Sequence, residues 1–296
     1  MPIYFLERNL LSMLKENEGD VMRVKVRCFS HYSLAALFSI GWMSGAGAAT
    51  LIGEGHAAGT QCGANGVNNS GVVVGECVLG GGNGTMVAWA APTPGTELSL
   101  TPLSVGQSCT VDGIANNGTI VGNCLNANND SFSVAWSSYS ASPQVKNPFP
   151  AGALGLLVGD AGSVAMGYSQ RGDVIGTSFN VNDVSTAVIW PTGSGTATPV
   201  SNLDDNCTPV SVNNTLVNGL PSVALDCPNP SVKGTVIPEI AQNNALLGGY
   251  TKTQLQIPTG YDYCTVSEIN DALNSIGSCH TAGPDHPVSA YWTSPS

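Results

Sequence analysis

The sequence predicts an all-β protein in which tandem β-hairpins form a five- or six-bladed propeller-like domain with local disulfides. Three observations indicate this fold. One short pattern recurs six times between residues 62 and 279, cysteines bracket most copies in pairs, and tryptophan recurs at one place after the hairpin. A period of this size is typical of propellers and solenoids, so an open stack of hairpins, a β-solenoid, is the alternative architecture.

Each copy of the repeat has two β-prone runs on either side of a polar turn. The copy at 109–124 reads CTVDGIANNGTIVGNC, and the copies begin at residues 62, 109, 163, 207, 235 and 264. Valine and isoleucine favour strands, and Asn-Asn-Gly supplies the positive φ angles that a hairpin turn needs. The last three copies start close together, so the repeat predicts either five or six blades.

A further strand follows each full hairpin and carries the recurring tryptophan. A fixed place for the largest side chain predicts a repeated core position at Trp89, Trp136, Trp190 and Trp292. We also expect a strand ahead of each hairpin, as at 100–103 and 199–203. The run 50–53 has no hairpin of its own, and we expect it to pair with the last blade, which would remove the exposed sheet edges.

Eight of the nine cysteines form spaced pairs, one pair to a hairpin. Where one member is missing the other is missing too, as at Ser163 and Ser178. This joint loss predicts four local disulfides, and zinc ligation is the alternative. Disulfides indicate an oxidising compartment. The predicted pairs are Cys62–Cys77, Cys109–Cys124, Cys207–Cys227 and Cys264–Cys279.

The N-terminal region predicts export. Residues 22–48 contain a basic stretch, the apolar run YSLAALFSIGWM and a small-residue cleavage site, which together make a secretory signal peptide. An acidic extension, residues 1–21, precedes it. We expect that translation starts at Met22 and that residues 1–21 are a start-site error; a genuine extended signal is the alternative. The repeat β-domain then spans residues 49–296, with no membrane span after signal cleavage.

Composition excludes several classes of partner. After residue 48 the chain has four basic and sixteen acidic residues, a net charge of −12. So few cations disfavour binding to nucleic acid and to anionic membrane surfaces. The four basic residues are Lys146, Arg171, Lys233 and Lys252.

The segment 102–122, PLSVGQSCTVDGIANNGTIVG, resembles the bacterial HAF family of extracellular repeats. The same order recurs at 66–75 with Val87-Ala88-Trp89 and at 167–176 with Val188-Ile189-Trp190. This chain departs from the family in its added half-cystines and in having no His-Ala-Phe string. The resemblance implies a secreted, propeller-like repeat protein and carries no activity with it.

Few residues suggest chemistry. The densest set of possible metal ligands is His280, Asp285 and His286, but their spacing matches no known motif, and a solvated loop is the simpler interpretation. Oxygen-rich turns at 126–130 and 204–206 are weak candidates for calcium, without the spacing of known calcium loops. We therefore assign no catalytic or cofactor-binding residue.

The sequence favours a non-catalytic binding or structural module that is secreted, periplasmic or displayed on the cell surface. Its partner would be a protein or a glycan. The alternative is a carbohydrate-active propeller enzyme, either a hydrolase or a lyase, which would need carboxylates and aromatic rings clustered at one mouth of the ring. Because the tryptophans occupy repeat positions rather than loops, we favour the binding module over the enzyme.

Overall fold

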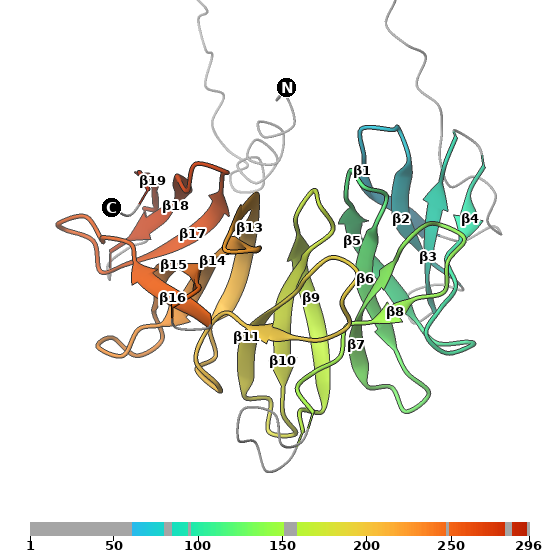
Figure 1. The fold of residues 1–296 in the computed structure, drawn as a ribbon, viewed down its shortest axis with the longest axis horizontal. Helices are drawn as coiled ribbons and strands as arrows, with labels where there is room; N and C mark the ends of the chain where they lie inside the picture. The colour runs from blue at the N-terminus through green and yellow to red at the C-terminus, as the bar shows by residue number, and fades with distance from the viewer. Residues whose placement is uncertain are drawn as a thin grey trace, which may run out of the picture. The chain divides into compact units, whose positions relative to one another are not determined.

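The computed structural model describes residues 61–79, 85–93, 96–150, 159–246, 249–281 and 286–294. Over these residues the protein is all-β, with five antiparallel sheets that we name A to E in chain order (Figure 1). Within each sheet every strand pairs with its neighbour in sequence. This meander is the blade arrangement of a propeller, so the predicted propeller-like hairpin repeat is confirmed, with five blades.

Sheets A, B and C have the same four-stranded plan. Sheet A contains β1 (Gln61–Val67), β2 (Val73–Val78), β3 (Met86–Ala91) and β4 (Leu98–Ser99). Sheet B contains β5 (Cys109–Ile114), β6 (Ile120–Leu125), β7 (Ser131–Trp136) and β8 (Gln144–Val145). Sheet C contains β9 (Gly162–Tyr168), β10 (Val174–Phe179), β11 (Ser185–Trp190) and β12 (Thr198–Pro199).

Sheets D and E depart from that plan. Sheet D contains β13 (Thr208–Val217), β14 (Leu220–Pro228), β15 (Val236–Asn244) and β16 (Gly249–Gln254). Sheet E contains β17 (Tyr263–Ile269), β18 (Ser275–His280) and β19 (Val288–Trp292). No helix in the described part of the chain is long and apolar enough to cross a bilayer.

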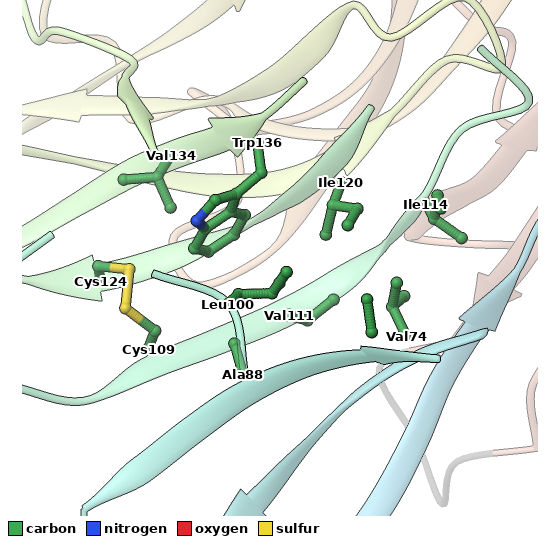
Figure 2. Packing of buried hydrophobic residues seen from close by; sticks show 11 residues of the cluster. Val74, Ala88, Leu100, Cys109, Val111, Ile114, Ile120, Cys124, Val134 and Trp136 are labelled. Atoms are coloured by element: carbon green, nitrogen blue, oxygen red, sulfur yellow. A yellow bond between two sulfur atoms is a disulfide. The ribbon is translucent and has the colours of Figure 1, made fainter. Parts of the chain in front are cut away.

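Neighbouring sheets pack face to face. The first strand of each sheet contacts the first strand of the next, from β1 and β5 through to β13 and β17. Between sheets A and B, Val74 of β2 and Ala88 of β3 pack against Ile114, Ile120 and Trp136 of sheet B (Figure 2). The core is thus a series of apolar layers, one at each interface between sheets.

The glycine of the Val-Gly step is required by close packing. A Cβ added at Gly176 would lie 2.0 Å from the carbonyl oxygen of Val164 and 3.0 Å from the ring of Trp190. At Gly277 the same atom would meet Thr265 at 1.9 Å and Trp292 at 3.0 Å. The tryptophan can lie against the hairpin because this position has no side chain.

All eight paired cysteines form the predicted disulfides, Cys62–Cys77, Cys109–Cys124, Cys207–Cys227 and Cys264–Cys279. In sheet B, Cys109 and Cys124 stand directly opposite each other on adjacent strands. Ser163 and Ser178 hold the equivalent places in sheet C. Because the sulfur atoms are bonded to one another, they offer no thiolate pairs for zinc.

Two details differ from the sequence-based expectation, and a third expectation concerns residues that the structure does not describe. The strands expected ahead of the hairpins, at 100–103 and 199–203, instead lie slightly earlier, at Leu98–Ser99 and Thr198–Pro199, and complete the preceding sheet. The copies at 207 and 235 share sheet D, as hairpins β13–β14 and β15–β16, because β14 pairs with β15 and so joins the two hairpins. The run 50–53 lies outside the described residues.

The tryptophans occupy buried positions on the third strands. The exposed fractions are 1% for Trp89, 0% for Trp136 and Trp190, and 8% for Trp292. Trp136 stands opposite Ile120, whereas Trp89 stands opposite Gly75, a displacement of two residues in the pairing of sheet A. A shift of two residues keeps a side chain on the same face of a sheet, so Trp89 still points into the core.

Candidate ligand-binding cleft

The fourth strand of each four-stranded sheet is its outer strand. The residue that follows the outer strand is a buried aliphatic residue in sheets A, C and D. Leu100, Val200 and Leu255 have exposed fractions of 3%, 1% and 3%. Each backbone N–H donates to a carbonyl of the third strand in its own sheet: Leu100 to Ala88, Val200 to Ala187 and Leu255 to Pro238. The shared hydrogen bond defines one structural position of the repeat, and that position belongs to the core.

In sheet B the same position is Lys146. Its N–H donates to Ser133 over 2.8 Å, as in the other sheets, and the residue is 1% exposed. The ammonium Nζ donates to the carbonyl of Ser194 over 2.6 Å and to Gln144 Oε1 over 3.3 Å. An ammonium has three hydrogens to donate. The third has no acceptor among the described residues.

Lys146 also lacks a paired carboxylate in the part of the chain that the structure describes. The ion pairs found there are Arg171–Asp173 and the two that Lys252 forms with Asp205 and Glu239. Burying a charge without an opposite charge is costly. Burial accordingly lowers the pKa of Lys146 from 10.5 to about 8, opposed by the more distant carboxylate of Asp173.

The lysine lies at the wall of a cleft of about 420 Å³ between sheets B and C. Both sheets contribute to the wall, which consists mainly of hydroxyl, amide and small side chains: Thr119, Ala135, Ser137, Ser142, Gln144, Lys146, Thr192 and Gly193. Gln144 Nε2 donates to the carbonyl of Gly193 over 3.2 Å and so ties the two sheets together at the cleft. The arrangement offers a cation surrounded by neutral hydrogen-bonding groups.

Two larger hollows lack such a cation. One, of about 750 Å³, lies beside β19. The other, of about 760 Å³, is lined by apolar residues such as Phe132 and Phe149, and its one acidic residue, Asp160, accepts a hydrogen bond from Ser178. The residues that line these two hollows include no buried charged group without a hydrogen-bond partner. The larger volumes therefore do not make either hollow the better candidate site.

Three carboxyl groups, Asp112, Asp160 and Asp226, also have a raised pKa, and each has a hydrogen-bond partner within the scaffold. Burial raises the pKa of Asp226 to about 6, although Val266 N donates to its carboxylate over 2.9 Å from the next sheet. Burial of the carboxyl group, with the charge of Glu76 nearby, raises the pKa of Asp112 to about 6, and Asn123 donates to it over 3.1 Å. The bond from Val266 to Asp226 joins sheets E and D, and the bond from Asn123 to Asp112 lies within sheet B.

The residues proposed from sequence as metal ligands are only partly described. His280 stacks on its cross-strand neighbour Tyr263, with ring centroids 4.7 Å apart, and His286 is exposed. Asp285 lies outside the described residues. The group with the closest ligand atoms, Cys207, Cys227 and Glu239, contains two sulfur atoms that are already joined in a disulfide.

The oxygen-rich turns use their side chains to close the turns. Asn126 Oδ1 accepts from the backbone N–H groups of Asn128 and Asp130. Asp205 accepts from Asn202 N and Ser201 Oγ and pairs with Lys252. Calcium at these turns would have to displace these contacts.

The sequence did not indicate Lys146, although a signal was present. Placing the outer strand at 100–103 hid the alignment of Lys146 with Leu100, Val200 and Leu255. Once the strand is placed at Leu98–Ser99, the substitution of a charged residue for an aliphatic one is visible. A local departure from the repeat pattern is where function is expected.

Comparison with known proteins identifies no family. No family model matches this chain, and neither does any curated protein. The fold has distant counterparts among solved structures. A putative TolB from Agrobacterium tumefaciens is 9% identical over 78% of this chain and 76% of its own, with a TM-score of 0.48.

Two further structures are less similar. A mutant of AofleA from Arthrobotrys oligospora, in which arginines are replaced by alanine, is 10% identical over 79% of this chain and 69% of its own, with a TM-score of 0.39. A protein of unknown function from Dyadobacter fermentans is 12% identical over 79% of this chain and 78% of its own, with a TM-score of 0.39.

Proposed function

We propose that this protein is a non-catalytic, secreted or cell-envelope repeat module that binds an acidic glycan in the cleft around Lys146. The observation that carries the proposal is the buried ammonium at a position where sheets A, C and D have leucine or valine. A carboxylate would supply the acceptor and the negative charge that Lys146 lacks, forming a charge-assisted hydrogen bond.

The lining of the cleft favours a sugar acid over a simple anion. Thr119, Ser137 and Ser142 contribute hydroxyl groups to the lining of the cleft, and Gln144 contributes its amide. Such groups match the hydroxyls of a saccharide ring, while the lysine matches its carboxylate. The four disulfides support export to an oxidising compartment, where glycans of this kind occur, and the resemblance to HAF repeats supports the same location.

The test compares two lysine variants in binding to a trimer of galacturonic acid, measured by calorimetry, with a neutral galactose trimer as the uncharged probe. Lys146→Leu installs the residue type of the equivalent positions, so the fold should persist with equal or higher thermal stability while binding to the acidic trimer is lost. Lys233→Leu removes an exposed lysine and should leave binding unchanged. Binding should weaken as the pH is raised through about 8, where Lys146 loses its charge.

Other outcomes would oppose the proposal. If Lys146 only stabilises the connector, Lys146→Leu will lower thermal stability and leave acidic-trimer binding intact. Equal binding of the neutral trimer would exclude charge recognition. Release of shorter sugars during incubation would favour the carbohydrate-active enzyme over a binding module.

A further inference from the structure

Hydrogen bonds link each hairpin turn to the turn of the next sheet. The donor is a backbone N–H and the acceptor is a side-chain oxygen at the same position of the next repeat. The bonds run from Asn69 to Asn116 (3.0 Å), from Asn116 to Gln170 (3.1 Å), from Gln170 to Asn214 (2.7 Å) and from Asn214 to Asp271 (2.6 Å).

We call this series of hydrogen bonds between turns the turn relay. Its two ends carry complementary groups, a donor at sheet E and an acceptor at sheet A. At the sheet E end, the N–H of Asp271 makes no hydrogen bond to the described residues, and at the sheet A end the same holds for the side-chain oxygen of Asn69. Both residues are exposed. One end of the relay therefore offers the donor that the other end would accept.

The outer face of sheet E exposes an apolar position that is buried in every other sheet. Val74, Val121, Ile175 and Ala224 occupy this position in sheets A to D, and all are 0% exposed. Ile276 occupies it in sheet E and is 48% exposed. Its cross-strand neighbour Tyr291 is 63% exposed.

Sheet A exposes a second apolar position, on its first strand, that is buried in sheets B, D and E. Ile114, Val212 and Ile269 occupy one position on the first strands of sheets B, D and E and are 2%, 8% and 4% exposed. Val67 holds that position in sheet A and is 65% exposed. No described sheet precedes sheet A to cover its first strand, as the preceding sheet covers the first strands of sheets B, D and E.

The exposed surfaces of sheets E and A correspond to the two sides of the interface that joins neighbouring sheets. Between sheets A and B, Val74 and Ile114 lie in the same apolar cluster (Figure 2). Val74 corresponds to Ile276 and Ile114 corresponds to Val67, so sheet E carries one half and sheet A the other. Figure 1 shows these two sheets at opposite ends of the row.

We infer that sheet E of one copy docks against sheet A of a second copy, head to tail, with Ile276 packed on Val67 and the turn relay continued from Asp271 N to Asn69 Oδ1. This contact repeats the geometry that already joins the sheets within one chain. A contact of this kind joins two different surfaces, so it is heterologous and either closes a ring of copies or extends as a chain. It is independent of glycan binding at Lys146.

The experiment measures the mass of the purified full-length exported protein by native mass spectrometry and sedimentation. The wild type should form dimers or larger assemblies in a concentration-dependent manner. Ile276→Lys should abolish assembly, and so should Val67→Lys, because each places a charge in the proposed contact. Val105→Lys is the control, since Val105 is 99% exposed in the connector between sheets A and B.

Mixing the two variants tests the head-to-tail arrangement. Each variant keeps one intact surface, so an equal mixture of Ile276→Lys and Val67→Lys should form a dimer of one copy of each. A wild type that stays monomeric at the highest concentration reached would overturn the inference. So would full assembly of Val67→Lys alone, which would mean that sheet E pairs with itself. Unchanged disulfides and melting temperatures in both variants exclude misfolding as the cause.

Discussion

Trp136 Nε1 donates a hydrogen bond of 2.8 Å to the carbonyl oxygen of Thr101, across the interface between sheets B and A. Trp190 makes the same bond to Asn147 over 2.9 Å, and Trp292 makes it to Gln256 over 2.8 Å. Each acceptor lies in the connector after an outer strand. The recurring tryptophan thus fills the core and also attaches the connector of one sheet to the face of the next.

The first prediction concerns Trp89, whose buried Nε1 has no partner among the described residues. Trp136→Phe removes ring volume and a hydrogen bond, whereas Trp89→Phe removes ring volume and an unsatisfied donor. The loss in unfolding free energy should therefore be larger for Trp136→Phe by about 1 kcal/mol. Urea denaturation of both variants measures the difference, and equal losses would contradict the role given to the bond.

The second prediction uses the sheet that has no disulfide. Ser163 and Ser178 stand directly opposite each other, where sheet B has a disulfide, so Ser163→Cys with Ser178→Cys should form a fifth bond. The serines already hold the connectors, since Ser163 Oγ donates to Lys146 O over 2.7 Å and Phe149 N donates to Ser178 Oγ over 3.0 Å.

The gain from the new disulfide should therefore fall below the roughly 3 kcal/mol that closing a loop of this length contributes in the chain-entropy model. Non-reducing mass mapping checks that the bond forms, and urea denaturation measures the gain. The matched control is Cys109→Ser with Cys124→Ser, which lacks compensating serine contacts and should lose about the full amount. A gain in sheet C equal to the loss in sheet B would show that the serine hydrogen bonds contribute nothing.

Local sequence signals were sufficient to predict the hairpins and their disulfides. The pairing of Cys109 with Cys124 follows from the joint loss of both partners in another copy, and Asn-Asn-Gly fixes the turn between them. These features depend on contacts within one repeat. The sequence places β4 too late, because a strand of two residues, Leu98–Ser99, has too little pattern to distinguish it from the apolar residue that follows.

Interactions between repeats were much harder to predict. The merging of two copies in sheet D depends on the pairing of β14 with β15, strands of different copies, which no pattern within one copy predicts. The cleft depends on Lys146 meeting Ser194 from the next sheet, a contact over many positions of sequence. A lysine in a chain of polar turns looks like a solvated residue until its neighbours in space are known.

The third prediction concerns the glycine beneath the tryptophan ring. Gly176→Ala would place a methyl group 2.0 Å from the carbonyl oxygen of Val164, so the first two strands of sheet C must separate. Because the backbone of a packed sheet must move, the unfolding free energy should fall by about 1–3 kcal/mol. Gly193→Ala is the comparison, since its Cβ would meet nothing within 4 Å, and only its φ of 75° opposes the change. Thermal denaturation should show the larger loss for Gly176→Ala, and the reverse order would refute the packing argument.

The fourth prediction is the pH dependence of stability due to Lys146. Burial lowers its pKa from 10.5 to about 8, so between these values the unfolded chain holds a proton that the folded chain has released. Because the unfolded state binds more protons there, the contribution of this group to stability rises with pH. The carboxylate that acts on the ammonium is Asp173, which accepts hydrogen bonds from Ser169 and Thr192 and partly offsets the lowering of the lysine pKa.

The measurement is urea unfolding of wild type and Lys146→Leu at a series of pH values across this window. The variant should be relatively more stable near neutral pH, and the wild type should recover the difference as the pH rises from about 8 towards 10.5. Lys233→Leu should show no such recovery, because Lys233 is exposed. A constant difference between wild type and Lys146→Leu would mean that the ammonium keeps its proton in the folded protein, and that the cleft therefore stabilises the charge without a ligand.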